Sequence, residues 1–150
     1  MGKITSLAIN HGKLKPMSYK KQIKIITNYG IEGDRFSKLN DLRQIMIVDA
    51  KLYENNNLAK GSLRENILVE NMNLNSCFEG QKILINNILE IKITLVKDAC
   101  ASINYNDPKT IDKLKGNMYL FATPINTGFI SLNNNIEIIW KTLIYLYLLE

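Results

Sequence analysis

The sequence predicts a mainly β protein that forms a closed or nearly closed β-barrel with two or three short helices. Seven or eight short apolar runs, most of them alternating with polar residues, are separated by segments rich in Gly, Pro and Asn. Helical signals are confined to short stretches, which argues against a sheet built from repeated strand–helix–strand units. The 150 residues, 46% of them hydrophobic, suffice for one core and leave little room for a second domain.

The chain begins with two alternating segments. Residues 4–9 and 22–27 each place apolar side chains on one face, which predicts two half-buried strands. The stretch 10–21 between them holds a glycine, a proline and several lysines, and residues 28–40 are polar and lack a period. Both stretches are predicted to be loops, and loops on a rigid scaffold are where binding sites are commonly built.

A short helix is predicted after the next strand. Residues 44–48 form a short apolar strand, and Asp49 follows it as an N-cap. The helix is expected to run to about Leu58, with Leu52 and Tyr53 on its buried face. Three consecutive asparagines near its end weaken the last turn.

The clearest local pattern is a β-hairpin in the middle of the chain. Residues 81–85 and 88–96 are strand-like and are joined by Asn86 and Asn87, and asparagine tolerates the positive φ that tight turns require. A further short strand is predicted at residues 67–69.

The last third of the chain combines one helix with three strands. Asp107 as N-cap and Pro108 at the first helical position predict a short helix that ends at Gly116. The strand-like runs that follow are residues 118–122, 129–132 and 136–140. We expect a barrel domain over residues 1–140 and an apolar tail, 141–150, that packs on the barrel or at a homodimer contact.

Charge and cysteine content narrow the class of partner. Nineteen Lys and Arg against 14 Asp and Glu give a net charge of +5, which suits an anionic cofactor, a small anionic substrate or an acidic protein. The lysines are scattered, which argues against nucleic acid. The apolar run 136–149 is shorter than a membrane span, so no membrane partner is expected. Two cysteines, Cys77 and Cys100, are too few for a disulfide framework, which favours a reducing, cytoplasmic setting.

Cys100 is the first candidate for chemistry. It follows a predicted strand and stands among small residues that would leave its sulfur accessible, and the thiolate is the reactive form of cysteine. Lys97 nearby favours the thiolate, whereas Asp98 disfavours it. The alternative is a buried cysteine that serves as a small hydrophobic residue.

A loop with two glycines and a nearby pair of arginines is the second candidate. Its backbone N–H groups, around Gly33 and Asp34, can face an anion. Arg35 and Arg43 can each offer a planar set of donors to a phosphate or another oxoanion. The alternative is a structural turn in which Asp34 caps the loop and Arg35 pairs with a surface acid.

Glu65 and Asn66, at the entrance to a predicted strand, form the third candidate. Their side chains can hydrogen-bond a ligand ring or can brace a loop. His11 is the only histidine and the chain has no Cys-x-x-Cys pair, which argues against a histidine-activated nucleophile and against a zinc site.

These motifs follow one another in a specific order. From the N-terminus they are Gly2-Lys3, Gly30-Ile31-Glu32-Gly33-Asp34-Arg35, Arg43-Gln44, Asp49-Ala50, Glu65-Asn66-Ile67, Gly80 and Cys100. The order resembles the MOSC domain, which is found at the C-terminal end of molybdenum cofactor sulfurases and as stand-alone bacterial proteins. The resemblance covers residues 2–138 and implies a MOSC-like β-barrel.

The resemblance also implies a cofactor and a role for a cysteine. In the family, a cysteine either carries sulfur as a persulfide or ligates the molybdenum of a bound pterin, the molybdenum cofactor (molybdopterin), and Cys100 stands at that position. The residues implied to bind the cofactor are Gly33, Asp34, Arg35, Arg43, Glu65 and Asn66. Family members of this size include reductases of N-hydroxylated compounds, which implies an oxidoreductase or a sulfur transferase. The alternative is a non-catalytic carrier that hands sulfur or the cofactor to a partner protein.

The chain departs from the family pattern at four places. Phe36 follows Gly-Asp-Arg where His is common, and Arg64 precedes Glu-Asn where Gly is usual. Ala99 stands before the cysteine in place of Pro or Glu, and Asn134-Asn135 replace a late Gly-Asp. These departures bear on the activity more than on the fold.

Overall fold

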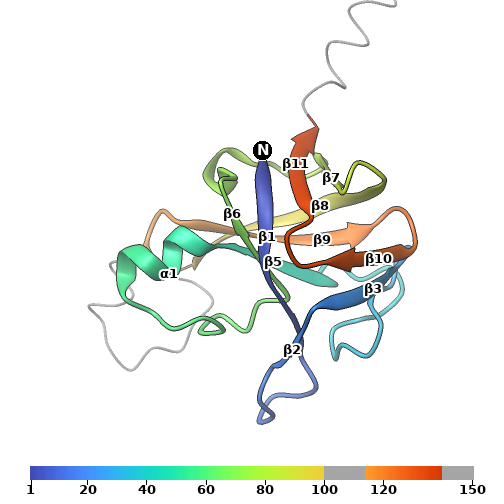
Figure 1. The fold of residues 1–150 in the computed structure, drawn as a ribbon, viewed down its shortest axis with the longest axis horizontal. Coiled ribbons are helices and arrows are strands. Elements are labelled where there is room, and N and C mark those ends of the chain that lie inside the picture. Colours follow the sequence, from blue (N-terminus) through green and yellow to red (C-terminus); the bar gives the residue numbers. More distant parts are fainter. Residues whose placement is uncertain (100–113, 140–150) are drawn as a thin grey trace, which may run out of the picture.

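Seven strands close into a barrel in the computed structural model, which describes residues 1–99 and 114–139. They are β1 (Gly2–Ile9), β5 (Ile45–Asp49), β6 (Ile67–Glu70), β7 (Lys82–Ile85), β8 (Leu89–Asp98), β9 (Met118–Pro124) and β11 (Asn135–Ile139). Their order is β11-β7-β8-β9-β5-β6-β1, and the pairing of β1 with β11 closes the ring (Figure 1). All neighbours are antiparallel except β5 and β6, which run parallel. The predicted barrel is confirmed.

Four further strands lie outside this ring. β2 (Ser18–Lys20) pairs with β1, and β10 (Gly128–Ser131), β3 (Gln22–Ile26) and β4 (Gly30–Ile31) form a separate three-stranded sheet. Both β2 and β4 fall in stretches that the sequence predicts to be loops, so those predictions were incomplete. β2 pairs with the preceding strand β1 and β4 with the preceding strand β3, and each is only two or three residues long, which is too short to show an alternating pattern.

The predicted helix is present as α1 (Ala50–Asn56). Asp49 caps it, since its side chain accepts a hydrogen bond of 2.9 Å from the N–H of Lys51. Asn57 ends it in the left-handed conformation, with φ of 52°, so the helix stops before the predicted Leu58. A 3₁₀ turn, η1 (Leu74–Ser76), is the other helical element among the residues described.

The predicted hairpin is formed by β7 and β8. Asn86 and Asn87 take φ values of 54° and 60°, and the N–H of Ile88 donates to the carbonyl of Ile85 at 3.2 Å. Asparagine has this role throughout the described chain: seven of the eight non-glycine residues with positive φ are Asn, and the eighth is Arg64.

Two apolar clusters lie on opposite sides of the barrel wall, and strand alternation assigns residues to them. On β5, Ile45 and Ile47 point into the barrel interior, whereas Met46 and Val48 point outward. On β9, Tyr119 and Phe121 likewise point outward. The outer cluster packs beneath α1, and its edge forms the floor of the cavity described below.

Several sequence predictions fall on residues that the structure does not describe. They are Cys100, the helix begun by Asp107 and Pro108, Trp140, and the tail 141–150. Within residues 1–99 and 114–139, the structure contains no helix long and apolar enough to cross a membrane.

Candidate anion-binding site

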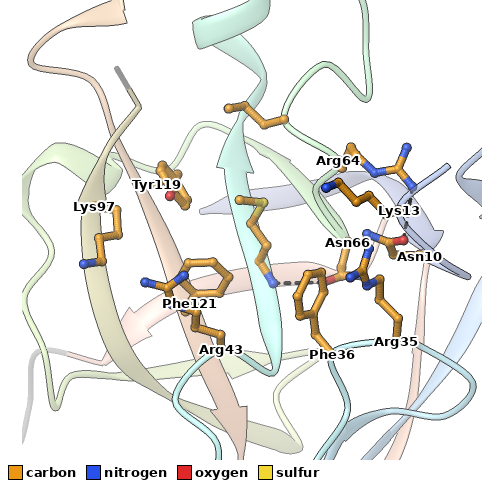
Figure 2. A pocket seen from close by; sticks show the side chains of 12 residues that line it. Asn10, Lys13, Arg35, Phe36, Arg43, Arg64, Asn66, Lys97, Tyr119 and Phe121 are labelled. Atoms are coloured by element: carbon orange, nitrogen blue, oxygen red, sulfur yellow. Dashed lines mark hydrogen bonds between the residues drawn. The ribbon is translucent and has the colours of Figure 1, made fainter. Parts of the chain in front are cut away.

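A cavity of about 480 Å³ opens on the outer face of the barrel wall (Figure 2). Its floor is formed by outward-facing strand residues, Met46 of β5 together with Tyr119 and Phe121 of β9. Its rim is formed by the loops that contain residues 10–13, 35–43 and 63–66. Segments far apart in the sequence therefore meet at one concave surface.

The cavity concentrates positive charge. Five of its twelve described lining residues are basic, and none of the twelve is acidic. The basic residues are Lys13, Arg35, Arg43, Arg64 and Lys97. The chain has three arginines among its 19 basic residues, and all three line this cavity. A cleft lined by one sign of charge focuses the electric field and attracts ligands of the opposite sign.

Asp34 places Arg35 at the cavity. Its buried carboxylate accepts hydrogen bonds from the N–H of Asn10 at 2.7 Å, the N–H of Phe36 at 3.0 Å and the side-chain amide of Asn66 at 2.9 Å. The N–H of Arg35 itself donates to the carbonyl of Asn10 at 2.8 Å. Asp34 therefore joins three segments of the chain by hydrogen bonds, and it supports the cavity without lining it. Gly33 lies just before it with φ of 85°, a conformation that favours glycine.

Arg43 is positioned by its neighbour Gln44, which is fully buried. The Gln44 side-chain amide donates to the carbonyls of Asn28 and Lys38, both at 2.9 Å. Its oxygen accepts from the hydroxyl of Thr123 on β9. The loop of residues 28–40 is thereby fastened to the barrel wall immediately beside Arg43.

The guanidinium groups of Arg35 and Arg43 each lie against an aromatic ring of the cavity. Arg35 lies over the ring of Phe36, 4.8 Å from its centroid, and Arg43 lies over Phe121 at 5.6 Å. Within residues 1–99 and 114–139, neither guanidinium takes part in a hydrogen bond or an ion pair. Both retain the forked donors that match a phosphate or carboxylate group.

Part of the Arg64 guanidinium is already hydrogen-bonded within the protein. Its Nη2 donates to the carbonyls of Gly12 at 2.8 Å and Lys15 at 2.7 Å, and to Oδ1 of Asn10 at 3.1 Å. It thus holds the loop that carries Lys13 against the cavity. Its backbone has φ of 59°, a left-handed conformation that glycine adopts more readily than arginine.

Asn66 and Glu65 point to opposite sides of the strand entrance. The Asn66 side chain lines the cavity, but its amide donates to the carbonyl of Ala8 and to Asp34, and its oxygen accepts from the N–H of Met46. These bonds make Asn66 a brace for the site. The Glu65 carboxylate is buried on the α1 side, where it accepts from the Tyr53 hydroxyl and, at 3.0 Å, from the N–H of Gly61. Glu65 is absent from the cavity lining.

Burial raises the pKa of the Glu65 carboxyl above its ordinary value, and the hydrogen bonds from Tyr53 and Gly61 offset part of that rise. A carboxyl held in this way supports the loop between α1 and β6. By fixing this loop, Glu65 supports its two chain neighbours, Arg64 and Asn66, which line the cavity.

Of the two cysteines, the structure describes Cys77 but not Cys100. Cys100 lies outside the described residues; Ala99, just before it, is fully buried, and Lys97 lines the cavity. Cys77 is buried beside the barrel core, and burial raises the pKa of its thiol to about 11. A thiol with so high a pKa is a poor nucleophile at neutral pH.

The structure brings Arg35, Arg43 and Asn66 to one cavity, with Asp34 directly behind them. Sequence reasoning did not select six other lining residues, which are Asn10, Lys13, Met46, Leu63, Tyr119 and Phe121. Lys13 belongs to the lysine-rich loop 10–21, and the positive charge of that loop was the one feature of the sequence that could have indicated it as a binding residue. The aromatic residues could not be distinguished from ordinary strand residues.

Comparisons with known proteins identify the fold. No family model and no curated protein matches the chain. YuaD from Bacillus subtilis matches with a TM-score of 0.67 at 16% identity, over 92% of this chain and 96% of that protein. YiiM from Geobacillus stearothermophilus matches with a TM-score of 0.67 at 11% identity, over 94% and 76% of the two chains. YiiM from Escherichia coli matches with a TM-score of 0.58 at 13% identity, over 91% and 69%. The barrel of this chain is the fold that these proteins share.

Proposed function

We propose that this chain is a MOSC-type domain that binds the molybdenum cofactor, an anionic pterin, in the basic cavity on the barrel wall. The observation that carries the proposal is the convergence of all three arginines of the chain on that cavity. The fold shared with YiiM and YuaD and the order of the sequence motifs support it.

The lining residues fit the chemistry of such a cofactor. Arg35 and Arg43 each present a guanidinium that makes no hydrogen bond or ion pair with residues 1–99 and 114–139, so either can hold its phosphate, and Lys13 and Lys97 add positive charge. Phe36 and Phe121 hold the two guanidinium groups by cation–π contact and add apolar surface to the cavity beside them. The volume of about 480 Å³ is in the range of small-molecule pockets.

Cys100 is the residue that would carry sulfur or ligate molybdenum. It follows β8 by two residues, and Lys97 near the end of that strand lines the cavity. The bound cofactor would supply the redox centre for reducing an N-hydroxylated compound, while the chain binds it, orients it and limits access of water.

A non-catalytic carrier of sulfur or cofactor is the second candidate, and the rim of the cavity favours it. Three of the basic rim residues stand beside exposed apolar residues, in the pairs Lys13-Leu14, Arg35-Phe36 and Leu42-Arg43. A charged cavity with an apolar rim suits contact with another protein that receives the cargo.

The test is to purify the protein from a host that makes the cofactor and to measure bound molybdenum and pterin. We expect both in amounts close to one per chain. Arg35→Gln and Arg43→Gln should each lower the pterin content, whereas Lys24→Gln, which removes a lysine placed over Phe129 and away from the cavity, should not. Wild-type protein without pterin would contradict the proposal.

Cys100→Ser separates the two candidates. A reductase should keep its pterin but lose turnover of N-hydroxylated substrates. A sulfur carrier should lose the extra sulfur atom that mass spectrometry detects on the wild-type cysteine, and the wild type should show no such turnover.

A further inference from the structure

The basic residues of the cavity fall into two groups at its opposite ends (Figure 2). Arg43 and Lys97 lie at one end, beside Tyr119 and Phe121. The other end holds Lys13, Arg35 and Arg64. We call these the strand group and the loop group.

The strand group is built on β8 and β9. Lys97 stands directly opposite Tyr119 in the antiparallel pair, and the Tyr119 and Phe121 rings meet edge to face at 5.6 Å. Arg43 lies over the Phe121 ring at 5.6 Å. The two cations therefore share one aromatic support.

The loop group is built around Asn10. Its backbone carbonyl accepts from the N–H of Arg35 at 2.8 Å, and its side-chain oxygen accepts from Arg64 at 3.1 Å. Arg64 also holds the carbonyls of Gly12 and Lys15, on either side of Lys13 along the chain. These three cations are connected through hydrogen bonds of the protein.

Strand β5 separates the two groups. Met46 of β5 pairs with Phe121 of β9 on one side, and on the other its N–H donates to Asn66 at the start of β6. Neighbouring strands lie about 4.8 Å apart, so Phe121 of β9, beneath Arg43, lies on the order of 10 Å from the start of β6, just after Arg64. A single phosphate is too small to neutralise both groups.

We infer that the ligand of this cavity carries two anionic groups, one for each end, joined by an apolar or planar middle section that lies over Met46. The inference rests on the proposed function, because it describes the ligand of the same cavity. An anion at one end alone would leave the cations at the other without a counter-charge in a cleft whose described lining has no acid. A ligand with two anionic ends neutralises both groups in one binding event.

The test compares ethylphosphonate with a series of alkane-α,ω-bisphosphonates, from ethane to decane, by calorimetric titration of the wild-type protein. We expect affinity to peak at an intermediate spacer, at roughly tenfold or more above the monophosphonate. Arg43→Gln and Arg35→Gln should each reduce the best bisphosphonate to about the affinity of the monophosphonate. Lys24→Gln should leave the peak unchanged, and far-UV circular dichroism should show that all variants are folded.

A series that is flat with spacer length, or a stoichiometry of two bisphosphonates per chain, would overturn the inference. So would equal losses of ethylphosphonate binding in both arginine variants, since that result means one shared anion position. The outcome is separable from the proposed function: a flat series with cofactor bound removes this inference alone, and a peaked series without pterin in the purified protein removes the proposed function alone.

Discussion

Arg64 combines an unfavourable backbone conformation with a favourable set of side-chain contacts. Its φ of 59° is in the left-handed region, where a non-glycine residue costs about 1–2 kcal/mol. Its guanidinium donates to three acceptors in the loop that carries Lys13. Strain retained at a cavity wall is typical of a residue kept for function.

Two substitutions of Arg64 separate these effects. Arg64→Ala keeps the strained backbone and loses the hydrogen bonds, whereas Arg64→Gly loses the bonds but removes the strain. We expect Arg64→Gly to be more stable than Arg64→Ala by about 1 kcal/mol in urea unfolding. In both variants trypsin should cut the native protein after Lys13 faster than in the wild type. Equal stability of the two variants, or unchanged cleavage, would contradict this account.

At the scale of elements, the α1–β6 connection depends on one buried carboxyl. Glu65 accepts from Tyr53 of α1 and from the N–H of Gly61, and the Tyr53 hydroxyl accepts from the N–H of Leu63 at 2.9 Å. This network joins the helix to the loop that ends in Arg64. The support of the cavity wall and the packing of α1 are therefore linked.

The raised pKa of Glu65 predicts a pH dependence of stability. Because the pKa is higher in the folded than in the unfolded chain, protonation of Glu65 favours folding. That contribution is fully present below the unfolded pKa and is lost as pH rises through the folded pKa. The wild type should therefore lose stability relative to Glu65→Gln as pH rises from acid to neutral, measured by urea unfolding at a series of pH values.

Glu54→Gln is the matched control, since Glu54 is exposed on the same helix. Its stability should follow that of the wild type across the same pH range. Parallel curves for the wild type and Glu65→Gln would show that the carboxyl is ionised equally in both states.

At the scale of the whole molecule, a short seam closes the barrel. β1 and β11 share two residue pairs, Gly2 with Ile136 and Lys3 with Asn135. A Cβ added at Gly2 would lie 2.9 Å from the carbonyl oxygen of Ile136 and 3.0 Å from that of Glu70. Both contacts are with backbone, so relief requires the strands to move apart.

Gly2→Ala should therefore weaken barrel closure and destabilise the protein by about 1–3 kcal/mol, measured by urea unfolding followed by circular dichroism. Lys3→Ala, an exposed position on the same strand, is the control and should change stability by less than about 0.5 kcal/mol. A Gly2→Ala protein as stable as this control would mean that the seam can widen without cost.

The sequence by itself determined the features that depend on neighbouring residues. Alternation along β1, β3 and β9 marks their buried faces, Asp49 caps α1 through its own backbone, and Asn86-Asn87 form a turn that needs only positive φ. Arg35 and Arg43 were selected because they stand in and just after a glycine-containing loop and carry planar sets of donors. Each of these signals is local, so it survives in a linear sequence.

Only the tertiary structure decided which of the selected residues meet and what each of them does. Asp34 and Asn66 were candidates for binding, yet their polar atoms are used in bonds that hold Asn10 and Met46. Glu65, next in the chain to Asn66, faces the opposite side. Figure 2 shows Arg43 and Lys97 at one end of the cavity and Lys13, Arg35 and Arg64 at the other, and the strand order β8-β9-β5-β6-β1 puts β8 and β9 on one side of β5 and β6 and β1 on the other. Strand order is set by packing and pairing between distant segments, and no local pattern in the sequence records it.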